Sequence, residues 1–547
     1  MSFSDKIDEK NKSEIGNTIR SRISFITNLL YGKSIQPMVN FYNTDTEYFV
    51  GGNEKDENDS GYSYDTRVVL QKKYHDFTKI IMQIGNGEED QLEYIKSGTS
   101  GHTFHGMVKL DVNNTFEYGV KVVAYPKKEQ YGDMYDVRRP ENAELKMIKL
   151  LSYFVVRRQT PHIVLPIGTF DTSIETFTSS NMTDCVCDVD GDGKIKKNEK
   201  YDEFMEKYKN GDYYDKVSIL ISEWANRGDL LDFLRKYHGT SNFTLHHWKS
   251  IFFQLLSVLA VIQSKYPSFR HNDLKANNLL VHKITKPDDF FTYRIAKKKY
   301  RVKNIGYQIK MWDFDFACIP GIVDNKKVES EWTKTINVTP TQNRYYDVHY
   351  FFNTLIKKSF CSGIMTNKNV PQEVRDFINR LLPEKYRNDP LANELKSYIE
   401  KNIHDKYKDC QYGTKFINGY PMNPTIRKYI ENMIPDKFKH IKVGVVHEKG
   451  RLLVDDEYLT PLEILETDPF FAEYRIDDKE TQNKNNPFLF GGNNTNESYD
   501  KKKINIEQIS THISPKDIDI DKVLGVKKSK KTSKRCSSKK KKSKYDK

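Results

Sequence analysis

The stretch "HNDLKANNLLV", residues His271 to Val281, places an acid, a base and two side-chain amides directly before an apolar run of β type. An Asp held in a rigid turn, here Asp273, can accept a proton from an attacking hydroxyl. An Asn five residues later, Asn278, can bind Mg²⁺, and Lys275 can neutralise a phosphoryl group in transfer. Taken alone, a polar turn on a strand explains the loop equally well.

Four other segments strengthen the case for phosphate chemistry. Asp313 follows a β-type run in "KMWDFDFA", where its carboxylate could grip a metal-bound nucleotide. Gly98 and Gly101 in "IKSGTSGHTF" would let a hairpin backbone close over phosphates. Lys121 lies mid-strand among apolar residues, where a lone charge needs a partner or an anion, and Glu144 lies in a helical run. The glycine pair is the weakest signal, but five such segments in this order are strong evidence.

The dense patterning between residues 89 and 475 has strands first and helices later. Short β-type runs such as "FEYGVKVVAY" and "KVSILISEW" precede helical runs such as "TLHHWKSIFFQLLSVLAVIQ". This order favours a small β-rich lobe followed by a larger α-rich lobe. Residues 1–88 form a polar N-terminal extension with one amphipathic helical run, and residues 476–547 lack periodicity and are expected to be disordered.

The five segments resemble, in order, the signature of the protein kinases: the Gly-rich loop, the strand lysine, the helix-C glutamate, H-R-D-L-x-x-x-N and D-F-G. The resemblance covers residues 89–475, apart from insertions. It implies an α+β bilobal fold, with a β-rich N-lobe and an α-rich C-lobe, and ATP with Mg²⁺ in the cleft between them.

The resemblance implies a role for each matching residue. Asp273 is expected to be the catalytic base, with Lys275 assisting at the γ-phosphate. Asn278 and Asp313 are expected to hold magnesium. Asp347 is expected to brace the catalytic loop.

Further residues are expected to bind the nucleotide. Lys121, paired with Glu144, would hold the α- and β-phosphates. The expected hinge, Ser222 to Trp224, would lie near the adenine. The glycine-rich loop would contribute the remaining nucleotide-binding residues, which are Ile95, Lys96, Ser97, Gly98, Thr99, Ser100, Gly101, His102 and Thr103.

The sequence also departs from the family pattern. Lys96 replaces the first loop glycine, and Thr103 replaces the valine that usually covers the adenine. Asp315 is the third residue of the D-F-G motif, and Asp tolerates the left-handed backbone that this turn requires better than most residues. Asn272 replaces the arginine that usually answers to a phosphorylated activation loop, so we expect activity without that phosphorylation.

Two more departures concern the segments around Asp313. No A-P-E motif follows it, which weakens the case for peptide recognition, and a Lys-rich insert, "KITKPDDFFTYRIAKKKYRVKNIGYQ", separates it from the catalytic loop. Atypical kinases of large DNA viruses resemble this pattern, which implies a viral protein.

An unexpected motif, "DVDGDGKIKKNE", fits the calcium-loop template of the EF-hand. Residues 184–205 would form an EF-hand-like insertion between two N-lobe strands, and we hypothesise that Ca²⁺ orders it and biases the hinge. An Asp-rich surface loop is the alternative, because the segment before the loop is a poor helix and no second loop pairs with it. The expected calcium ligands are Asp188, Asp190, Asp192, Lys194 through its carbonyl, and Glu199.

The positive charge of the chain is concentrated at its end. Residues 527–547 hold 12 Lys and Arg against one Asp, which accounts for most of the net charge of +13. This basic tail could be a solubilising end, a nuclear-targeting signal, or a site for nucleic acid or an acidic partner.

The cysteines and the apolar runs indicate an intracellular protein. The six cysteines are scattered without a C-x-x-C pair, as in a reducing compartment. The N-terminal residues are polar, and the longest apolar run, Phe252 to Ile262, suits a buried helix rather than a membrane span. We expect the cytoplasm or the nucleus and no membrane association, with packaging in a virion compatible with a viral origin.

These features together predict an ATP-dependent serine/threonine protein kinase with protein substrates, since Lys275 two residues after the base is typical of that class. Two alternatives stay open. One is a small-molecule phosphotransferase, because choline- and aminoglycoside-type kinases also lack A-P-E. The other is a catalytically inactive, nucleotide-binding scaffold.

Overall fold

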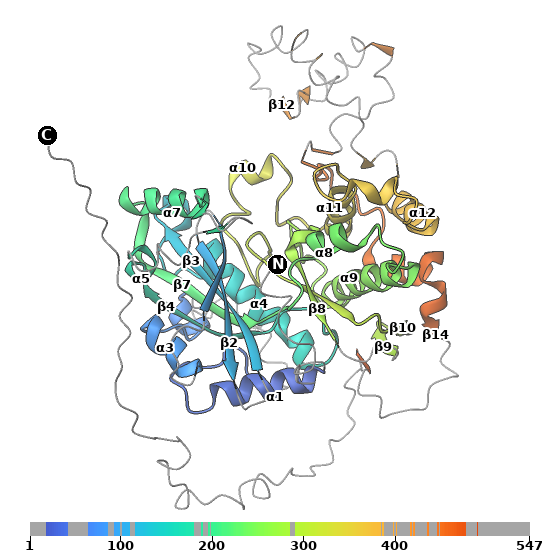
Figure 1. The fold of residues 1–547 in the computed structure, drawn as a ribbon. Coiled ribbons are helices and arrows are strands. Elements are labelled where there is room, and N and C mark those ends of the chain that lie inside the picture. The colour runs from blue at the N-terminus through green and yellow to red at the C-terminus, as the bar shows by residue number, and fades with distance from the viewer. Residues whose placement is uncertain are drawn as a thin grey trace, which may run out of the picture. The chain divides into compact units, whose positions relative to one another are not determined.

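The protein is described here from a computed structural model (Figure 1). The chain divides into two units, Met1–Gly492 and Asn493–Lys547, and every described residue belongs to the first. The described residues are 18–41, 64–85, 92–98, 101–109, 115–179, 188–189, 195–196, 198–284, 290–383, 386–387, 398, 401, 416–417, 420–421, 435–436, 446–447, 449–476 and 489–490.

The N-lobe is built on a five-stranded antiparallel sheet with the order β1-β2-β3-β7-β4. The central strand shows why this sequence forms a sheet: Val120, Val122 and Ala124 are buried on one face, while Lys121 alternates to the other. The strands are β1 (Leu92–Ser97), β2 (Gly101–Lys109), β3 (Thr115–Pro126), β4 (Pro166–Ser173) and β7 (Tyr213–Glu223).

Three helices complete this lobe: α1 and α3 precede the sheet in the chain, and α4 connects β3 to β4. α1 (Ile19–Leu30) starts with a capping box between Thr18 and Ser21, and its Phe25 ring stacks on Phe116 of β3 with 3.7 Å between the ring centroids. α3 (Phe77–Ile84) also buries its apolar side in the same core. α4 (Pro140–Val156) begins with Pro140 at its first position, where no backbone donor is lost.

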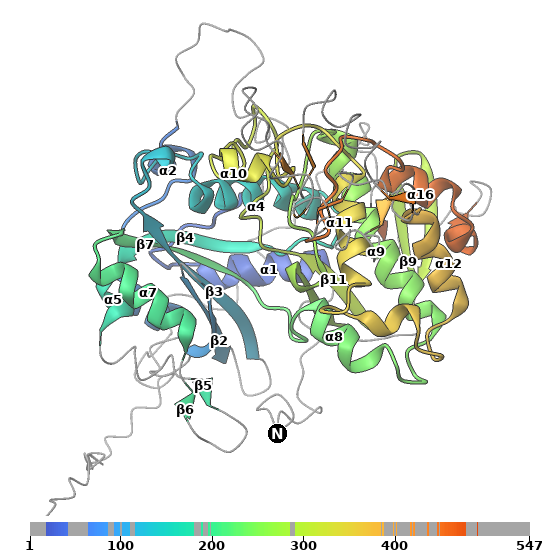
Figure 2. The ribbon, with the colours of Figure 1, turned by 90° about the horizontal axis from the view of Figure 1, so that it is seen from above.

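The C-lobe is mainly helical (Figure 2). Its central helix, α9 (Leu245–Lys265), is apolar over most of its length, and every residue from Ser250 to Gln263 is buried. α9 is the one described helix long and apolar enough to cross a membrane, but 78% of that stretch is buried inside the protein, as expected for Phe252 to Ile262. The other main helices are α8 (Leu230–Tyr237), α11 (Tyr346–Leu355), α12 (Gln372–Leu381) and α16 (Pro461–Thr467).

The insert between the catalytic loop and Asp313 is folded. β8 (Leu279–Lys283) pairs with β11 (Tyr307–Met311), and the insert between them forms a hairpin of β9 (Phe290–Ile295) and β10 (Lys298–Lys303). Tyr293 and Tyr300 of the hairpin are buried, and both rings contact Phe253 of α9. The insert is thus part of the C-lobe core.

The remaining elements are the 11-residue helix α7 and a set of shorter helices and strands. They are α2 (Thr66–Val69), η4 (Glu129–Tyr131), α5 (Glu175–Thr178), β5 (Asp188–Val189), β6 (Ile195–Lys196), α7 (Glu199–Lys209), η5 (Ala276–Asn278), α10 (Glu331–Lys334), η6 (Ser362–Met365), β12 (Phe416–Ile417), β13 (Tyr420–Pro421), η10 (Pro469–Tyr474), β14 (Arg475–Ile476) and β15 (Leu489–Phe490).

The predicted α+β fold, with a β-rich region before a helical one, is confirmed. Of the region 476–547, expected to be disordered, the structure describes Ile476 and Leu489–Phe490, which pair with β10 and β9. The basic tail, 527–547, lies outside the described residues. The extension 1–88 contributes α1 and α3 to the N-lobe core, while its boundary as a separate part stays a prediction.

Candidate active site

Lys121 of β3 lies between two carboxylates that come from different elements. Its Nζ is 2.6 Å from Oε1 of Glu144 on α4 and 3.0 Å from Oδ1 of Asp313, which follows β11. The ring of Trp312 lies 5.7 Å from the same nitrogen. The predicted pairing of Lys121 with Glu144 is present, and Asp313 joins it.

Lys121 and Asp313 stabilise each other's charged form, whereas burial and the charge of Asp313 raise the pKa of Glu144 to about 7. Burial alone would lower the pKa of Lys121, but the negative charges of Asp313 and Glu144 raise it on balance. Burial would likewise raise the pKa of Asp313, but the charge of Lys121 holds it well below its usual value. Lys121 and Asp313 are therefore both charged at neutral pH.

The catalytic loop, between α9 and β8, is held by Asp347 at the start of α11. The backbone nitrogens of His271 and Asn272 donate to the Asp347 carboxylate over 2.7 and 2.9 Å. Asn272 takes a left-handed backbone with φ of 62°. The Nε2 of His271 lies 3.0 Å from the carbonyl oxygen of Trp312, so this histidine is a structural hydrogen-bonding residue. The hydrogen bonds expected of Asp347 are present.

Two polar side chains of the catalytic loop, Lys275 and Asn278, contact the carboxylate of Asp273, which is buried. Its Oδ2 is 2.9 Å from Nζ of Lys275 and accepts from Nδ2 of Asn278 over 3.0 Å. Nδ2 of Asn278 also donates to the carbonyl oxygen of Asp273 over 2.8 Å. The structure therefore brings together the three residues that the sequence motif singled out.

Asn278 and Asp313, the expected magnesium ligands, are coupled through the backbone. The nitrogen of Trp312 donates to the carbonyl oxygen of Asn278 over 3.2 Å, so Asp313 directly follows a residue bonded to Asn278. The Asp313 side chain is 38% exposed. The NH₂ group of Asn278 donates to Asp273, so the amide oxygen of Asn278 is the atom that remains to bind a metal ion. Mg²⁺ takes oxygen ligands from one or two carboxylates and from substrate phosphates, so these residues fit it.

Comparison with known proteins decides the family. Residues 124–404 match the model of a family described as "Poxvirus serine/threonine protein kinase". A protein of Acanthamoeba polyphaga mimivirus that is named a serine/threonine-protein kinase, R400, is 40% identical to this chain over 467 residues. The aligned region covers 85% of this chain and 82% of that protein. The chain belongs to the poxvirus serine/threonine protein kinase family.

More distant relatives agree. Serine/threonine-protein kinase 2 of monkeypox virus is 34% identical over 112 residues, which are 20% of this chain and 23% of that protein. A second mimivirus protein named a serine/threonine-protein kinase, R301, is 23% identical over 320 residues, 53% of this chain and 76% of its own. The chain is thus a viral serine/threonine protein kinase, a class of enzyme that uses ATP with a divalent metal and acts on proteins.

The glycine-rich loop of the kinase is the β1–β2 hairpin. The nitrogen of Gly98 donates to the carbonyl oxygen of Gly101 over 2.7 Å. A Cβ on Gly101 would come within 1.8 Å of the carbonyl oxygen of Val122, so this position requires glycine because β3 approaches so closely. Thr99 and Ser100, also expected to bind nucleotide, lie outside the described residues.

The side chains of the hairpin divide between two faces. Thr103 pairs with Lys121 and shares its face, whereas His102 pairs with Val122 on the opposite face. The Nδ1 of His102 lies 2.9 Å from Oγ of Ser97, and its ring lies 4.6 Å from that of Phe204 on α7. His102 therefore has only its backbone to offer a nucleotide on the Lys121 face. Ile95 and Lys96, at an irregularity in β1, are exposed.

The side chain of Glu223, at the end of β7, turns away from the predicted adenine position. Its carboxylate accepts from Nε of Arg22 over 2.8 Å and lies 3.0 Å from Nζ of Lys310. The nitrogen of Leu165 also donates to it over 2.9 Å. Burial would raise the pKa of Glu223, but the charges of Arg22 and Lys310 lower it to about 2. Its side chain is a structural ion-pair centre and is not available to the base, and its backbone nitrogen donates to the carbonyl oxygen of Leu165 over 3.0 Å.

Trp224, the next residue, lies over the same face of the sheet as Lys121. Its ring stacks on that of His105, with 4.4 Å between the centroids and 29° between the planes. A Cβ on Gly119 would lie 3.4 Å from the indole. His105 pairs with Gly119 as Thr103 pairs with Lys121, so one face of β2 and β3 carries both the aromatic pair and the lysine. An aromatic surface therefore lies on the hinge side of Lys121.

The activation segment is held by its own ion pairs. Lys326 lies 2.7 Å from Oδ2 of Asp136, and Lys327 pairs with Asp315. The left-handed residue of the motif is Asp313, with φ of 62°, and Asp315 is not left-handed, which corrects the expected position of the turn. Activity without phosphorylation of this segment stays a prediction.

The calcium-loop prediction falls mostly outside the described residues, which omit Asp190, Asp192 and Lys194. Asp188 begins β5, which pairs with β6, and Glu199 begins the helix α7. Nδ2 of Asn198, just before Glu199, donates to the Tyr94 hydroxyl of β1 over 2.6 Å. The insertion thus contacts the glycine-rich hairpin, and calcium binding stays a prediction.

Sequence patterns did not predict three charged residues of the site: Arg22, Lys310 and Arg451. Each reaches its partner across the fold, and nothing in the neighbouring sequence marks it. Nη2 of Arg451 lies 2.5 Å from Oδ1 of Asp273, although 178 residues separate the two in the chain.

Proposed function

We propose that this kinase transfers the γ-phosphoryl group of ATP to serine or threonine hydroxyls of proteins, with Asp273 as the catalytic base. One observation supports this most strongly: the lysine and the carboxylate expected at the phosphates, Lys121 and Asp313, are 3.0 Å apart and are tied through Trp312 to the loop of Asp273. A polar turn without a catalytic role would have no reason to lie beside both Lys121 and Asp313.

Asp273 would accept the proton of the attacking hydroxyl. The substrate oxygen forms a bond to the γ-phosphorus while the bond from that phosphorus to the bridging oxygen of ADP breaks. The proton passes to the Asp273 carboxylate and from there to solvent. Lys275, 2.9 Å from the same carboxylate, would bring a positive charge to the oxygens of the moving group. Because the transition state is loose, positioning and charge supply most of the catalysis.

Lys121 would hold the α- and β-phosphates, and Glu144 would keep it in place. The ion pair between them, 2.6 Å long, would hold the lysine in position. Asn278 and Asp313 would hold Mg²⁺, which when bound neutralises charge on the phosphates.

Product identity tests this proposal. The purified protein would be incubated with ATP labelled at the γ-phosphate, magnesium and either casein or histone, and in parallel with choline or an aminoglycoside. We expect label on protein, recovered as phosphoserine or phosphothreonine after hydrolysis. Label on the small alcohols alone would establish a small-molecule phosphotransferase, and nucleotide binding without any transfer would establish a scaffold.

We propose Ca²⁺ binding at residues 188–199 as a second function of the same chain. The supporting observation is that α7 begins at Glu199, where the template requires the last ligand, and is anchored to β1 through Asn198. Calcium would then act on the glycine-rich hairpin. Isothermal titration should give a binding heat that Glu199→Gln abolishes, and no heat at millimolar calcium would rule the site out.

We also propose that the basic tail, 527–547, binds nucleic acid or another acidic partner, because its 12 Lys and Arg face a single Asp. Affinity for duplex DNA should fall steeply with salt and disappear when the tail is removed. Binding that survives removal would contradict the proposal. An intracellular location, in cytoplasm, nucleus or virion, is supported by the free, buried thiols of Cys318 and Cys361.

A further inference from the structure

Arg451 reaches the catalytic loop from far downstream. Nη2 of Arg451 lies 2.5 Å from Oδ1 of Asp273, and Nη1 donates to the carbonyl oxygen of Asn272. The other carboxylate oxygen of Asp273 is already engaged by Lys275 and Asn278. Each oxygen of the proposed base therefore has a donor of its own.

Two tyrosines of α11 hold the guanidinium of Arg451. Its central carbon lies 4.3 Å above the ring of Tyr350, and Nη1 lies 3.4 Å from the hydroxyl of Tyr346. Only 6% of Arg451 is exposed. The same helix carries Asp347, which holds the backbone of the catalytic loop, so α11 supports the loop both directly and through Arg451.

The backbone on both sides of Arg451 is fastened to the C-lobe. Nδ2 of Asn353 donates to the carbonyl oxygen of Gly450, and Nδ2 of Asn337 donates to that of Leu452, each over 3.0 Å. Gly450 has φ of +91°, a conformation that favours glycine, and Leu452 is fully buried. Arg451 is thus a fixed part of the fold rather than the end of a loose segment.

Asn272 explains why an arginine from elsewhere fits here. This position carries arginine in the resembled motif, but the Asn272 side chain donates to the carbonyl oxygen of Phe316 over 3.1 Å and offers no cation to the loop. We propose that Arg451 supplies the missing guanidinium and acts as a positioning residue, fixing the orientation of the Asp273 carboxylate without any phosphate on the activation segment. The inference rests on the proposed role of Asp273 as base.

An inhibitory plug is the rival explanation, in which Arg451 mimics a substrate group at Oδ1 and must leave before catalysis. The burial of Arg451, its seat on two tyrosines and its fastened backbone all argue against departure. The two explanations predict opposite effects of removing the side chain.

The test compares Arg451→Met, Arg451→Lys and Lys449→Met in the full chain. Lys449 is an exposed cation in the same turn and serves as the control. For Arg451→Met we expect kcat to fall about 10²-fold, as for a misplaced catalytic group, with the KM for ATP unchanged. Arg451→Lys should recover part of the loss because it keeps a cation, and it remains informative should the Met variant not fold. Lys449→Met should match wild type.

Other results would overturn the inference. A higher kcat in Arg451→Met would mean an inhibitory plug, and an equal loss of ATP binding would mean that Arg451 only supports the fold. Asp273→Asn is measured alongside, because an active Asp273→Asn would refute the base itself. A dead Asp273→Asn beside a fully active Arg451→Met would refute only the positioning role. Adding Arg451→Met to Asp273→Asn should cause no further loss.

Discussion

Replacing Arg22 by methionine should destabilise the N-lobe strongly, although Arg22 lies in the extension before the motifs. Its guanidinium donates to the carboxylate of Glu223 through both Nε and Nη2, and to the carbonyl oxygens of Pro161 and Ile163 over 3.0 Å each. Arg22 is only 4% exposed. The Arg22 side chain therefore links α1 to the hinge and to the segment that connects α4 to β4.

The magnitude follows from what Arg22→Met leaves behind. Breaking a buried ion pair by removing one partner costs about 3–5 kcal/mol, because the other charge stays buried. Lys310 would still lie 3.0 Å from Glu223 and would offset part of the cost, while two carbonyl groups would lose their donor. Methionine keeps most of the volume, so little cavity forms. We therefore expect the lower end of the range, about 3 kcal/mol.

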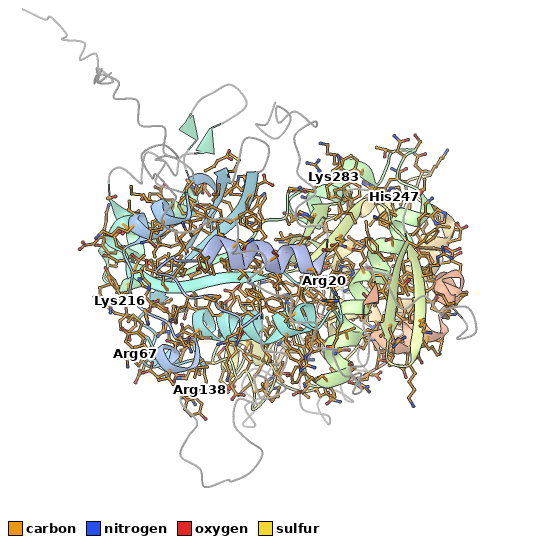
Figure 3. The ribbon with its side chains drawn as sticks, turned by 90° about the horizontal axis from the view of Figure 1, so that it is seen from below. Arg20, Arg67, Arg138, Lys216, His247 and Lys283 are labelled. Atoms are coloured by element: carbon orange, nitrogen blue, oxygen red, sulfur yellow. The ribbon has the colours of Figure 1, made fainter. Side chains whose placement is uncertain are left out.

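The assay is urea unfolding of wild type, Arg22→Met and Arg20→Met under identical conditions. Arg20 is an exposed arginine on the same helix and is the matched control (Figure 3). Arg20→Met should stay within about 0.5 kcal/mol of wild type, as surface changes usually do. If Arg22→Met and Arg20→Met unfold at the same urea concentration, the ion-pair centre at Glu223 does not stabilise the lobe and the reasoning fails.

Three further predictions follow from the site. Trp224→Ala should raise the KM for ATP about 2- to 10-fold with kcat unchanged, because it removes an aromatic stacking surface; the exposed Trp332→Ala is the control, and equal KM values would exclude stacking. Phosphatase treatment, checked by mass spectrometry, should leave activity intact, whereas Lys327→Met should lower it by freeing the activation segment; activity lost with the phosphate would contradict this. The pKa of Glu223 is about 2 rather than 4.5, so its contribution to stability is complete above pH 4.5 and is lost as the pH falls towards 2. The free energy of unfolding, measured across that pH window, should therefore drop less in Arg22→Met than in wild type.

The order of the two lobes and the residues around Asp273 and Lys121 could be predicted because each belongs to a short motif of consecutive residues. Asp273, Lys275 and Asn278 belong to one loop, so their spacing alone brings them together. Lys121 and Glu144 come from separate elements, and their pairing was predictable only because a charge among apolar strand residues requires a partner.

The missed residues are lone charges with distant partners. Arg22 meets Glu223 across 201 positions, and Arg451 meets Asp273 across 178. Such contacts depend on tertiary packing, which no local spacing encodes. The face on which His102 lies was also unpredictable, because a hairpin shifted by one residue would exchange its two faces.

The most direct test of the account is single-turnover transfer of label from ATP to protein by Asp273→Asn at saturating nucleotide. The exposed Asp232→Asn on α8 is the control. The account predicts that Asp273→Asn binds ATP like wild type but transfers about 10²- to 10⁴-fold more slowly, the usual contribution of a general base. Transfer at the wild-type rate by Asp273→Asn would show that Asp273 is not the base.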